Sequence, residues 1–230
     1  MGLLGVSVPE EYGGHGGDLR HDLVVFEQTQ KHRVEGFAVS LHNGIVTPYV
    51  QAHGTEAQKK KWLPGLVTGE RISAIAMSEP GAGSDIRGMK CAAVRDGGDW
   101  VVNGTKHFIS GADHADFFIV FIATGEDDTP KGPKKRITAF LVDRGTPGFT
   151  IRDGYKSVSH RGYKNMILDF DDCRLPDAQV LGEVDGGFEV MNTWLYATRI
   201  TVATMSVGRA RRVFDYALSY AAEREQFGQP

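Results

Sequence analysis

The stretch with the clearest chemical potential is EPGAGSD, residues 79–85, which follows an apolar, strand-like run. One interpretation is a tight connection whose glycines supply positive φ angles. The other is an anion site, where backbone N–H groups unshielded by Cβ atoms face a phosphate and Ser84 adds a hydroxyl donor. Ile86 stands where GxGxxG needs its third glycine, and no GxxxxGK[ST] pattern is present. The segment therefore matches neither the Rossmann fingerprint nor the P-loop.

Two further segments carry candidate ligand-binding side chains. In KHFISG, residues 106–111, Phe108 and Ser110 lie two positions apart in a strand-like run. Side chains at this spacing share one face of a strand, so we expect a flat ring and a hydroxyl to face one ligand; the alternative is a core phenylalanine. In REQFG, residues 224–228, an arginine and an aromatic residue end a helical run. The alternative there is a helix C-terminus stabilised by a cation.

Composition and charge exclude several classes of protein. The 230 residues carry a formal net charge of −3, so no general attraction to nucleic acid or to anionic membranes is expected. No apolar run approaches the roughly 20 residues that span a bilayer, and the first residues show no signal-peptide pattern. The eight histidines lack metal-ligand spacing, so no metal site is expected. Cys91 and Cys173 predict small buried thiols in a reducing compartment.

The elements that must position these residues fall into three zones, which predict an α+β fold. Residues 1–70 read as a partial helical domain and residues 71–183 as a central antiparallel β-barrel or sandwich. Residues 184–230 read as the first helices of a C-terminal helical bundle. Part of the apolar surface of the long run at 200–225 should lack a packing partner in this chain.

Local signals predict where elements begin, bend and turn. Thr55 to Gln58 has the pattern of a capping box, and Pro64 is expected to disturb the helix that follows. Asp96-Gly97-Gly98 and Asn103-Gly104 are typical of tight turns. Residues 124–136, which are mostly polar, predict a solvated loop.

The order and spacing of four motifs resemble the acyl-CoA dehydrogenase family of flavoproteins. The motifs are GLLGVSVPEEYGG, AMSEPGAGSD, NGTKHFISGADHAD and RxQFG, and they extend over nearly all of the chain. The resemblance implies FAD between the β-domain and the C-terminal helices. It also implies a partial chain, without the family's first helices and without most of its C-terminal helical domain.

The resemblance carries over cofactor-binding roles position by position. Residues 75–78 match the strand that hydrogen-bonds the flavin ring, residues 83–84 the pyrophosphate contact, and residues 108–110 the segment behind the isoalloxazine, where relatives often have Trp instead of Phe. Residues 224–227 match a segment that reaches the FAD of a neighbouring subunit, which implies a homo-oligomer. The implied FAD contacts are Ile75, Ala76, Met77, Ser78, Gly83, Ser84, Phe108, Ile109, Ser110, Arg224, Gln226 and Phe227.

Substrate contacts are implied in the same way. Ser84 also matches a position near the CoA-thioester arm, and Thr198-Arg199 matches a segment that lines the acyl-CoA site. Tyr196 stands where relatives often have an Asp that binds CoA, so this contact departs from the family pattern. The implied substrate is an acyl-CoA thioester, and the implied electron acceptor is electron-transfer flavoprotein.

The implied reaction is α,β-dehydrogenation, in which a carboxylate removes the α-proton while hydride leaves the β-carbon for flavin N5. Relatives place this base either beyond the RxQFG motif or just before the matching Arg199, where this chain has Thr198. Glu79 lies beside the glycines, and we favour a turn-ordering role for it. The catalytic base therefore remains unknown, and the 230-residue chain is expected to be inactive.

The sequence leaves three alternative functions open and gives one expected cellular location. The same fold serves related acyl-CoA oxidases and flavin monooxygenases, which the oxygen reactivity of the reduced flavin would distinguish. A non-catalytic module that binds FAD or a partner is the third. The cytoplasm, or the mitochondrial matrix in a eukaryote, is the expected location, and the motifs do not fix the acyl chain length.

Overall fold

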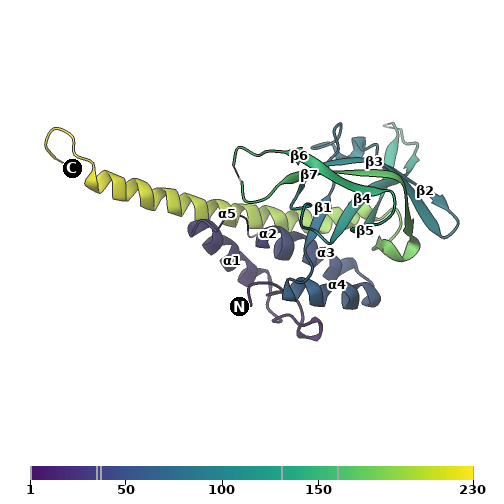
Figure 1. Cartoon of the computed structure of the whole chain (residues 1–230), viewed down its shortest axis with the longest axis horizontal. Coiled ribbons are helices and arrows are strands. Elements are labelled where there is room, and N and C mark those ends of the chain that lie inside the picture. The colour runs from purple at the N-terminus through teal and green to yellow at the C-terminus, as the bar shows by residue number, and fades with distance from the viewer. Residues whose placement is uncertain (1, 35, 37, 131, 160, 230) are drawn as a thin grey trace.

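The computed structural model describes residues 2–34, 36, 38–130, 132–159 and 161–229. A group of N-terminal helices packs against a central sheet domain, and one long helix runs beside both before it projects away from them (Figure 1). The predicted α+β fold, with N-terminal helices, a central β-domain and a C-terminal helix, is confirmed.

The N-terminal region is helical, as predicted, and its second capping box is the expected one. The Thr55 hydroxyl accepts from the Gln58 backbone N–H at 3.2 Å, and the Gln58 side chain accepts from the Thr55 N–H at 2.9 Å. The elements are η1 (Glu10–Tyr12), α1 (Leu19–Lys31), α2 (Val39–Leu41), the π-helix η2 (His42–Val46), α3 (Thr47–His53) and α4 (Glu56–Thr68).

The expected effect of Pro64 was wrong, because α4 continues through it. Pro64 removes the N–H that would bond to the Lys60 carbonyl. Both residues lie on the exposed side of the helix, where water can reach that carbonyl. Trp62 and Leu66 are buried on the other side, and their packing holds the helix together.

The described strands form one mixed sheet in the order β6-β7-β3-β2-β4-β5-β8, with β1 paired to β4. Most pairs are antiparallel, as predicted, but β1 pairs with β4 in parallel because the β2–β3 hairpin lies between them in the chain. The strands are β1 (Ser73–Ala76), β2 (Ala92–Asp96), β3 (Asp99–Ser110), β4 (Phe117–Asp127), β5 (Lys134–Asp143), β6 (Phe149–Tyr155), β7 (Asn165–Pro176) and β8 (Val180–Leu181); short 3₁₀ turns lie at η3 (Ile86–Gly88) and η4 (Asp177–Gln179).

One of the two predicted turns is present and the other is not. Gly97 and Gly98 join β2 to β3, and Asp96 pairs with Asp99 across this two-residue turn. The Asn103–Gly104 prediction was wrong, because both residues lie inside β3 at a register shift. Gly104 has φ of 140°, and a Cβ there would lie 2.6 Å from the Cα of Cys91 in β2. This glycine serves a close approach between strands.

The predicted solvated loop at 124–136 is shorter than expected. β4 extends to Asp127 and β5 begins at Lys134, so only residues 128–133 lie between the two strands. An ion pair between Glu126 and Lys135 joins facing residues of this ribbon. Opposite charges across a hairpin favour pairing, so polar composition alone did not indicate a loop here.

The sheet has a core on each side of β4, whose residues alternate between them. Phe117, Ile119 and Phe121 pack toward the helices, together with Trp62 and Leu63 of α4. The alternate residues of β4 pack into the interior of the curved sheet; these are Phe118, Val120 and Ile122. Because both faces of β4 are covered, it reads as an uninterrupted apolar run.

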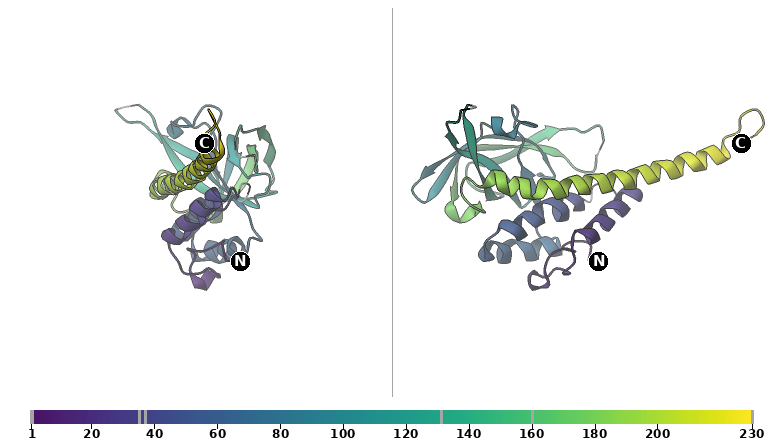
Figure 2. Two further views of the ribbon diagram at one scale, coloured as in Figure 1. Left: turned by 90° about the vertical axis from the view of Figure 1, so that its left-hand side faces the viewer. Right: turned by 180° about the vertical axis from the view of Figure 1, so that it is seen from behind.

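The long helix α5 (Gly187–Glu223) packs on the body through its first two-thirds and leaves it beyond α1 (Figure 2). The side of α5 that carries its arginines contacts α1. Arg209 donates to the Gln30 side chain at 2.7 Å, and Arg212 donates to the Gln30 carbonyl at 2.9 Å. The predicted uncovered apolar residues are confirmed, because Val213, Phe214, Leu218 and Tyr220 are each 59–65% exposed.

Candidate functional site

The glycine-rich loop leaves the end of β1 and closes on itself. The Glu79 N–H donates to the Ala82 carbonyl at 2.7 Å, and the Ala82 N–H donates to the Glu79 carbonyl at 3.1 Å. Gly83 and Ser84 are exposed. A Cβ built on Gly81 or on Gly83 meets no described atom within 4 Å. The fold therefore does not need a glycine at Gly83, and the open face of the loop can accept a ligand.

The Glu79 carboxylate orders this loop, as the sequence interpretation favoured. The side chain is 4% exposed and accepts from the backbone N–H groups of Lys90 at 2.6 Å and Cys91 at 3.1 Å. Lys106, which is fully buried in β3, donates to Glu79 Oε1 at 2.7 Å. Two backbone N–H groups and the Lys106 ammonium thus hold the Glu79 side chain in a structural position.

Lys106 also joins two of the segments predicted to surround the flavin. Its ammonium donates to the Met77 carbonyl at 3.1 Å, and the next residue, His107, donates its backbone N–H to the Ser78 carbonyl at 3.0 Å. The structure therefore places the 75–78 edge beside the 106–110 segment, with the glycine loop continuing from that edge. This arrangement brings together the sequence-predicted residues of the first three groups.

Whether Phe108 and Ser110 face one ligand stays a prediction, although the strand is irregular at Phe108. β3 shifts register between Lys106 and Ile109, and Phe108 has φ of 58°, so regular strand alternation fails there. The Phe108 ring is 52% exposed and lies 4.3 Å from the Tyr155 ring, measured between centroids. Ile109 is buried, and the Ser110 hydroxyl donates to Asn165 Oδ1 at 2.9 Å.

Ser110 and Thr198 meet at a cavity of about 190 Å³ between the sheet and α5. Apolar side chains from the π-helix region and α5, Leu41, Ile45 and Val202 among them, form much of its wall. Tyr196 and Arg199 lie on an exposed part of α5, with the guanidinium 5.3 Å from the ring centroid. Thr198 therefore lines a pocket between the sheet and α5, whereas Tyr196 and Arg199 are exposed.

The structure does not bring the REQFG segment to the other candidate residues within one chain. Arg224, Gln226 and Phe227 lie at the far end of the projecting α5 (Figure 1). Phe227 is completely exposed and has φ of 54°. These residues stay available to a different molecule, and their role remains a prediction.

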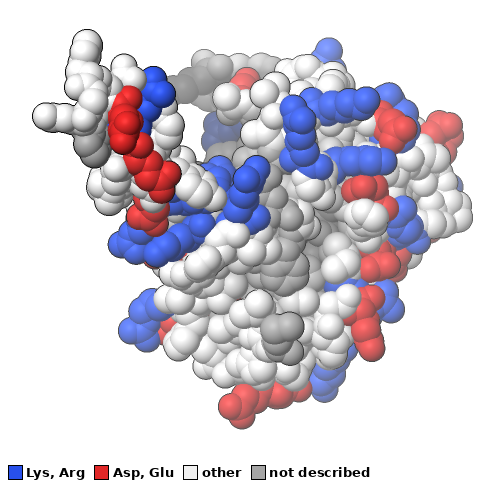
Figure 3. All heavy atoms as spheres, turned by 60° about the vertical axis from the view of Figure 1, so that its left-hand side comes forward, with Lys and Arg blue, Asp and Glu red and all other residues white. Residues whose placement is uncertain are grey.

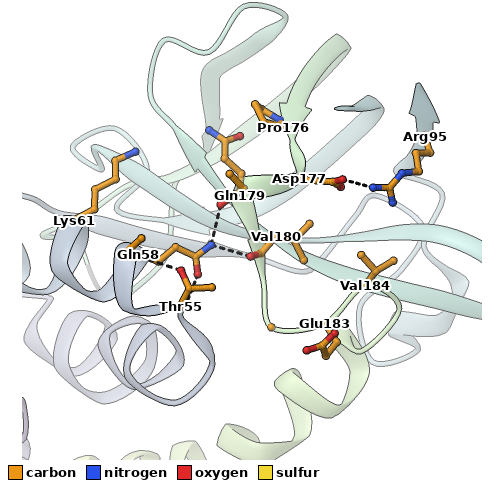
Figure 4. Close-up of a pocket in the computed structure, with 13 residues that line it drawn as sticks. Thr55, Gln58, Lys61, Arg95, Pro176, Asp177, Gln179, Val180, Glu183 and Val184 are labelled. Atoms are coloured by element: carbon orange, nitrogen blue, oxygen red, sulfur yellow. Dashed lines mark hydrogen bonds and ion pairs between the residues drawn. The ribbon is translucent and has the colours of Figure 1, made fainter. Parts of the chain in front are cut away.

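A larger open pocket of about 740 Å³ lies between the start of α4 and residues 176–184, away from the glycine loop (Figure 4). Gln58 donates to the carbonyls of Ala178 at 3.0 Å and Val180 at 2.8 Å, and Arg95 pairs with Asp177. None of the predicted site residues lines this pocket. Its polar groups hold α4 against the sheet, so we do not assign the site here.

Sequence reasoning missed three residues of the site: Lys106, Tyr155 and Asn165. A signal for Lys106 existed, because it shares strand parity with the buried Trp100 and Val102. A lysine on a buried face needs an anionic partner, and Glu79 was the available carboxylate. Tyr155 and Asn165 belong to β6 and β7, whose pairing with each other and with β3 depends on tertiary structure.

The described residues offer neither a reactive thiol nor a metal-binding cluster. Burial raises the pKa of the Cys91 thiol to about 12 and that of Cys173 to about 11, so both stay protonated. Among the described residues, no three His, Cys, Asp or Glu side chains gather where they could hold a metal ion. Basic and acidic side chains both occur on the face that Figure 3 shows. No described helix is long and apolar enough to cross a bilayer.

This fold and loop arrangement define an acyl-CoA dehydrogenase type of protein, and comparison with protein families agrees. Residues 1–70 match the acyl-CoA dehydrogenase N-terminal domain, residues 74–173 the middle domain and residues 185–230 the C-terminal domain. The chain belongs to the acyl-CoA dehydrogenase family.

Individual relatives give the same result over the whole chain. The mitochondrial isovaleryl-CoA dehydrogenase of Pongo abelii is 38% identical over 231 residues, which is 100% of this chain and 54% of that protein. The crystal structure of an acyl-CoA dehydrogenase from Geobacillus kaustophilus is 39% identical with a TM-score of 0.91, over 99% of this chain and 60% of that one. The crystal structure of an acyl-CoA dehydrogenase from Bacillus anthracis, complexed with FAD, is 35% identical with a TM-score of 0.90, over 100% of this chain and 39% of that one. The chain thus spans little more than half the length of its curated relative.

Proposed function

We propose that this chain carries the flavin-binding part of an enzyme that dehydrogenates acyl-CoA thioesters at the α,β position. The observation that carries the proposal is the Lys106 contact set, which joins the glycine loop to the 77–78 edge and to the 106–110 segment. Membership of the acyl-CoA dehydrogenase family supports it. The related acyl-CoA oxidases and flavin monooxygenases share the fold, and the relatives described above do not favour them.

The residues at the site fit FAD. The exposed loop at Gly81 and Gly83 has no protein atom where a Cβ would stand, so a pyrophosphate can approach its backbone. Ser84 adds an exposed hydroxyl, and the Phe108 ring offers an apolar surface beside Tyr155. We therefore assign FAD contacts to residues 75–78, 83–84 and 108–110 of this chain.

The chemistry divides between cofactor and protein. When bound, FAD accepts the hydride that leaves the β-carbon of the substrate. We propose that the chain orients the thioester near Ser84 and Thr198, and that the exposed Arg199 contacts the substrate only at the outer edge of the site. The apolar wall at Leu41 would keep water away from the acyl group.

The proton-accepting group is proposed to lie outside these 230 residues. A general base must come within about 3 Å of the α-proton. Thr198 has no basic group, and Glu79 is 4% exposed and bound to Lys106 and two backbone N–H groups, which hold it in its own turn. We therefore propose that the 230-residue chain alone does not complete the reaction.

The residues at the far end of α5 are the basis for a proposed partner subunit. Arg224, Gln226 and Phe227 contact no other part of the described site, which suits contacts to the FAD of a neighbouring subunit in a homo-oligomer. Electron-transfer flavoprotein is the proposed electron acceptor, and the cytoplasm or a mitochondrial matrix is the proposed location.

Flavin retention tests the proposal. The 230-residue chain and a form extended at both ends to the length of the relatives are purified in the presence of FAD, and the flavin-to-protein ratio is measured after gel filtration. We expect stoichiometric FAD in the extended form and weak retention by the short chain. An extended, folded protein without affinity for FAD would contradict the proposal. Rapid reoxidation of the reduced flavin by oxygen would favour an oxidase instead.

A further inference from the structure

Ser110 and Asn165 form a hydrogen-bonded pair of side chains beside the cavity between the sheet and α5. The Ser110 hydroxyl donates to Asn165 Oδ1 at 2.9 Å, and Ser110 lines this cavity together with Thr198. The two residues lie directly opposite each other in the pairing of β3 with β7, so their side chains share one face of the sheet. Asn165 does not line the cavity itself, so it can act there only through Ser110.

The backbone of Asn165 is fixed on two sides. The Gly111 N–H donates to the Lys164 carbonyl at 2.9 Å, which ties the end of β3 to the start of β7. On the other side, Asn165 pairs with Tyr155 of β6. A Cβ at Gly154 would lie 2.1 Å from the Asn165 carbonyl oxygen, so β6 lies close against this backbone. Two neighbouring strands therefore set the position from which the Asn165 side chain reaches β3.

The hydrogen bond to Asn165 decides how Ser110 can meet a ligand. A serine hydroxyl has one hydrogen and two lone pairs. Because the hydrogen of Ser110 is directed at Asn165 Oδ1, only lone pairs of the Ser110 oxygen remain for a molecule in the cavity. Ser110 is therefore a hydrogen-bond acceptor there. It stabilises a ligand atom that carries a hydrogen, and it offers nothing to a ligand atom that is itself an acceptor.

Oxidised and reduced flavin differ in this respect. Ring nitrogen N5 is an acceptor in oxidised flavin, and two-electron reduction converts it to an N–H group. In the proposed reaction N5 receives a hydride from the thioester, so N5 must face the space that holds the thioester. Ser110 belongs to the proposed flavin segment at residues 108–110 and lines the same cavity as Thr198, beside which the thioester is proposed to lie.

We propose that Asn165 is a positioning residue that makes Ser110 a hydrogen-bond acceptor for the reduced flavin and thereby raises the reduction potential of bound FAD. The inference rests on the proposed function, because it requires FAD beside residues 108–110. A higher potential favours the passage of two electrons from the thioester to the flavin. Without Asn165, the Ser110 hydrogen is free to turn toward the acceptor nitrogen of oxidised flavin, and the preference for the reduced form is lost.

The test measures the flavin reduction potential of the full-length flavoprotein without substrate, by reductive titration in the presence of a redox dye. The wild type is compared with Asn165→Leu, which has a similar size but no acceptor. We expect the preference for reduced over oxidised FAD to be about tenfold weaker in the variant, which for a two-electron couple lowers the potential by about 30 mV. Far-UV circular dichroism and the flavin-to-protein ratio check that the variant is folded and loaded.

Ser110→Ala separates positioning from a structural role. This small change removes the acceptor, so it should lower the potential by itself, and it tests the inference even where Asn165→Leu does not fold. In the Ser110→Ala background, Asn165→Leu should have no further effect on the potential, because the amide acts only through Ser110. Asn103→Leu is the matched control. Asn103 also connects β3 to β7, by donating to Asp172 at 3.0 Å, but it is exposed and does not line the cavity, so its potential should equal that of the wild type.

The outcomes separate this inference from the proposed function. An unchanged potential in Ser110→Ala, or in folded and FAD-loaded Asn165→Leu, would overturn the positioning role and leave the proposed function intact. An equal fall on adding Asn165→Leu in both backgrounds would show a general structural effect of Asn165 and would also overturn the role. A folded wild-type protein of full length without affinity for FAD would overturn both the inference and the proposed function.

Discussion

Glu79 Oε1 and Lys106 Nζ lie 2.7 Å apart, and their side chains are 4% and 0% exposed. The pair connects the loop after β1 to the middle of β3, and the same ammonium reaches the Met77 carbonyl. A buried charge is retained only when it is paired and hydrogen-bonded, and here both conditions are met. This ion pair is the structural basis of the proposed flavin site.

Removing one member of this pair should destabilise the fold strongly. Lys106→Met leaves the Glu79 carboxylate buried without its cation, and we expect the free energy of unfolding to fall by about 3–5 kcal/mol. Urea denaturation measures the change. Because Glu79→Gln alone would also leave a buried lysine, the double variant should lose much less than the sum of the two single losses.

A surface pair provides the control. Lys135 and Glu126 also form an ion pair, but their side chains are 36% and 42% exposed. Lys135→Met should therefore cost less than about 1 kcal/mol. A similar cost for Lys106→Met and Lys135→Met, or additive losses in the Glu79 and Lys106 cycle, would show that the buried pair is not coupled as described.

The glycine at position 83 should matter to the ligand and not to the fold. A Cβ at Gly83 meets no described atom within 4 Å, so Gly83→Val should leave the far-UV circular dichroism similar. In the full-length protein the valine should crowd the pyrophosphate and lower the flavin-to-protein ratio severalfold.

Gly98→Val is the matched control for this variant. Its position in the β2–β3 turn is equally free of neighbouring atoms but lies away from the proposed site. Flavin content should stay normal in Gly98→Val. Equal flavin content in the two variants would count against the role of the loop.

Sequence reasoning identified most elements because each was signalled locally. The uninterrupted apolar run at 117–123 predicted β4, and Gly97-Gly98 predicted the turn of the β2–β3 hairpin. Local sequence signals failed where contacts with distant residues determine the local conformation. Gly104 permits a close approach by Cys91 and makes no turn, and Pro64 remains in a helix held by buried Trp62.

The site was predicted where it depends on local pattern and missed where it depends on pairing. The exposed glycine loop could be recognised from its own residues. The register shift between Lys106 and Ile109 arises in the pairing of β3 with β7 and has no one-residue signature. The Lys106 partner lies 27 positions earlier in the chain, so the pair required the fold.

Gly208 should be needed where α5 crosses α1. A Cβ there would lie 2.4 Å from the Glu27 carbonyl oxygen, which is backbone and cannot rotate away. Helix propensity alone would make Gly208→Ala stabilising by about 1 kcal/mol. We expect the clash to dominate, with a loss of about 1–3 kcal/mol in the free energy of unfolding.

Ser206→Ala tests the same helix without the clash, because Ser206 is exposed. Its free energy of unfolding should change by less than about 0.5 kcal/mol. Increased stability of Gly208→Ala in thermal and urea unfolding would contradict the close packing of α1 on α5.

His42 should make stability depend on pH. Burial lowers its pKa below the ordinary value of 6.5. In the interval between the lowered pKa and 6.5, the unfolded chain binds a proton that the folded chain does not, so stability decreases as pH falls. Above this interval the contribution is constant.

The pH dependence is measured by urea unfolding across this range in the wild type and in His42→Gln. The slope due to His42 is at most about 1.4 kcal/mol per pH unit, and the variant should lose it. His53, whose pKa burial also lowers, keeps its own contribution in both proteins. Identical slopes in the two proteins would mean that His42 is not held neutral.

Anaerobic titration with acyl-CoA thioesters tests the central claim most directly. The full-length flavoprotein and the 230-residue chain supplied with saturating FAD are each mixed with thioesters of several chain lengths, and the flavin absorption band is followed without oxygen. The account predicts bleaching in the full-length protein and none in the short chain, whose Glu79 is held by Lys106 and whose Thr198 cannot accept a proton. A full-length protein that binds FAD but shows no bleaching with any thioester would contradict the proposed reaction. Rapid bleaching in the short chain would show that one of its own carboxylates is the base.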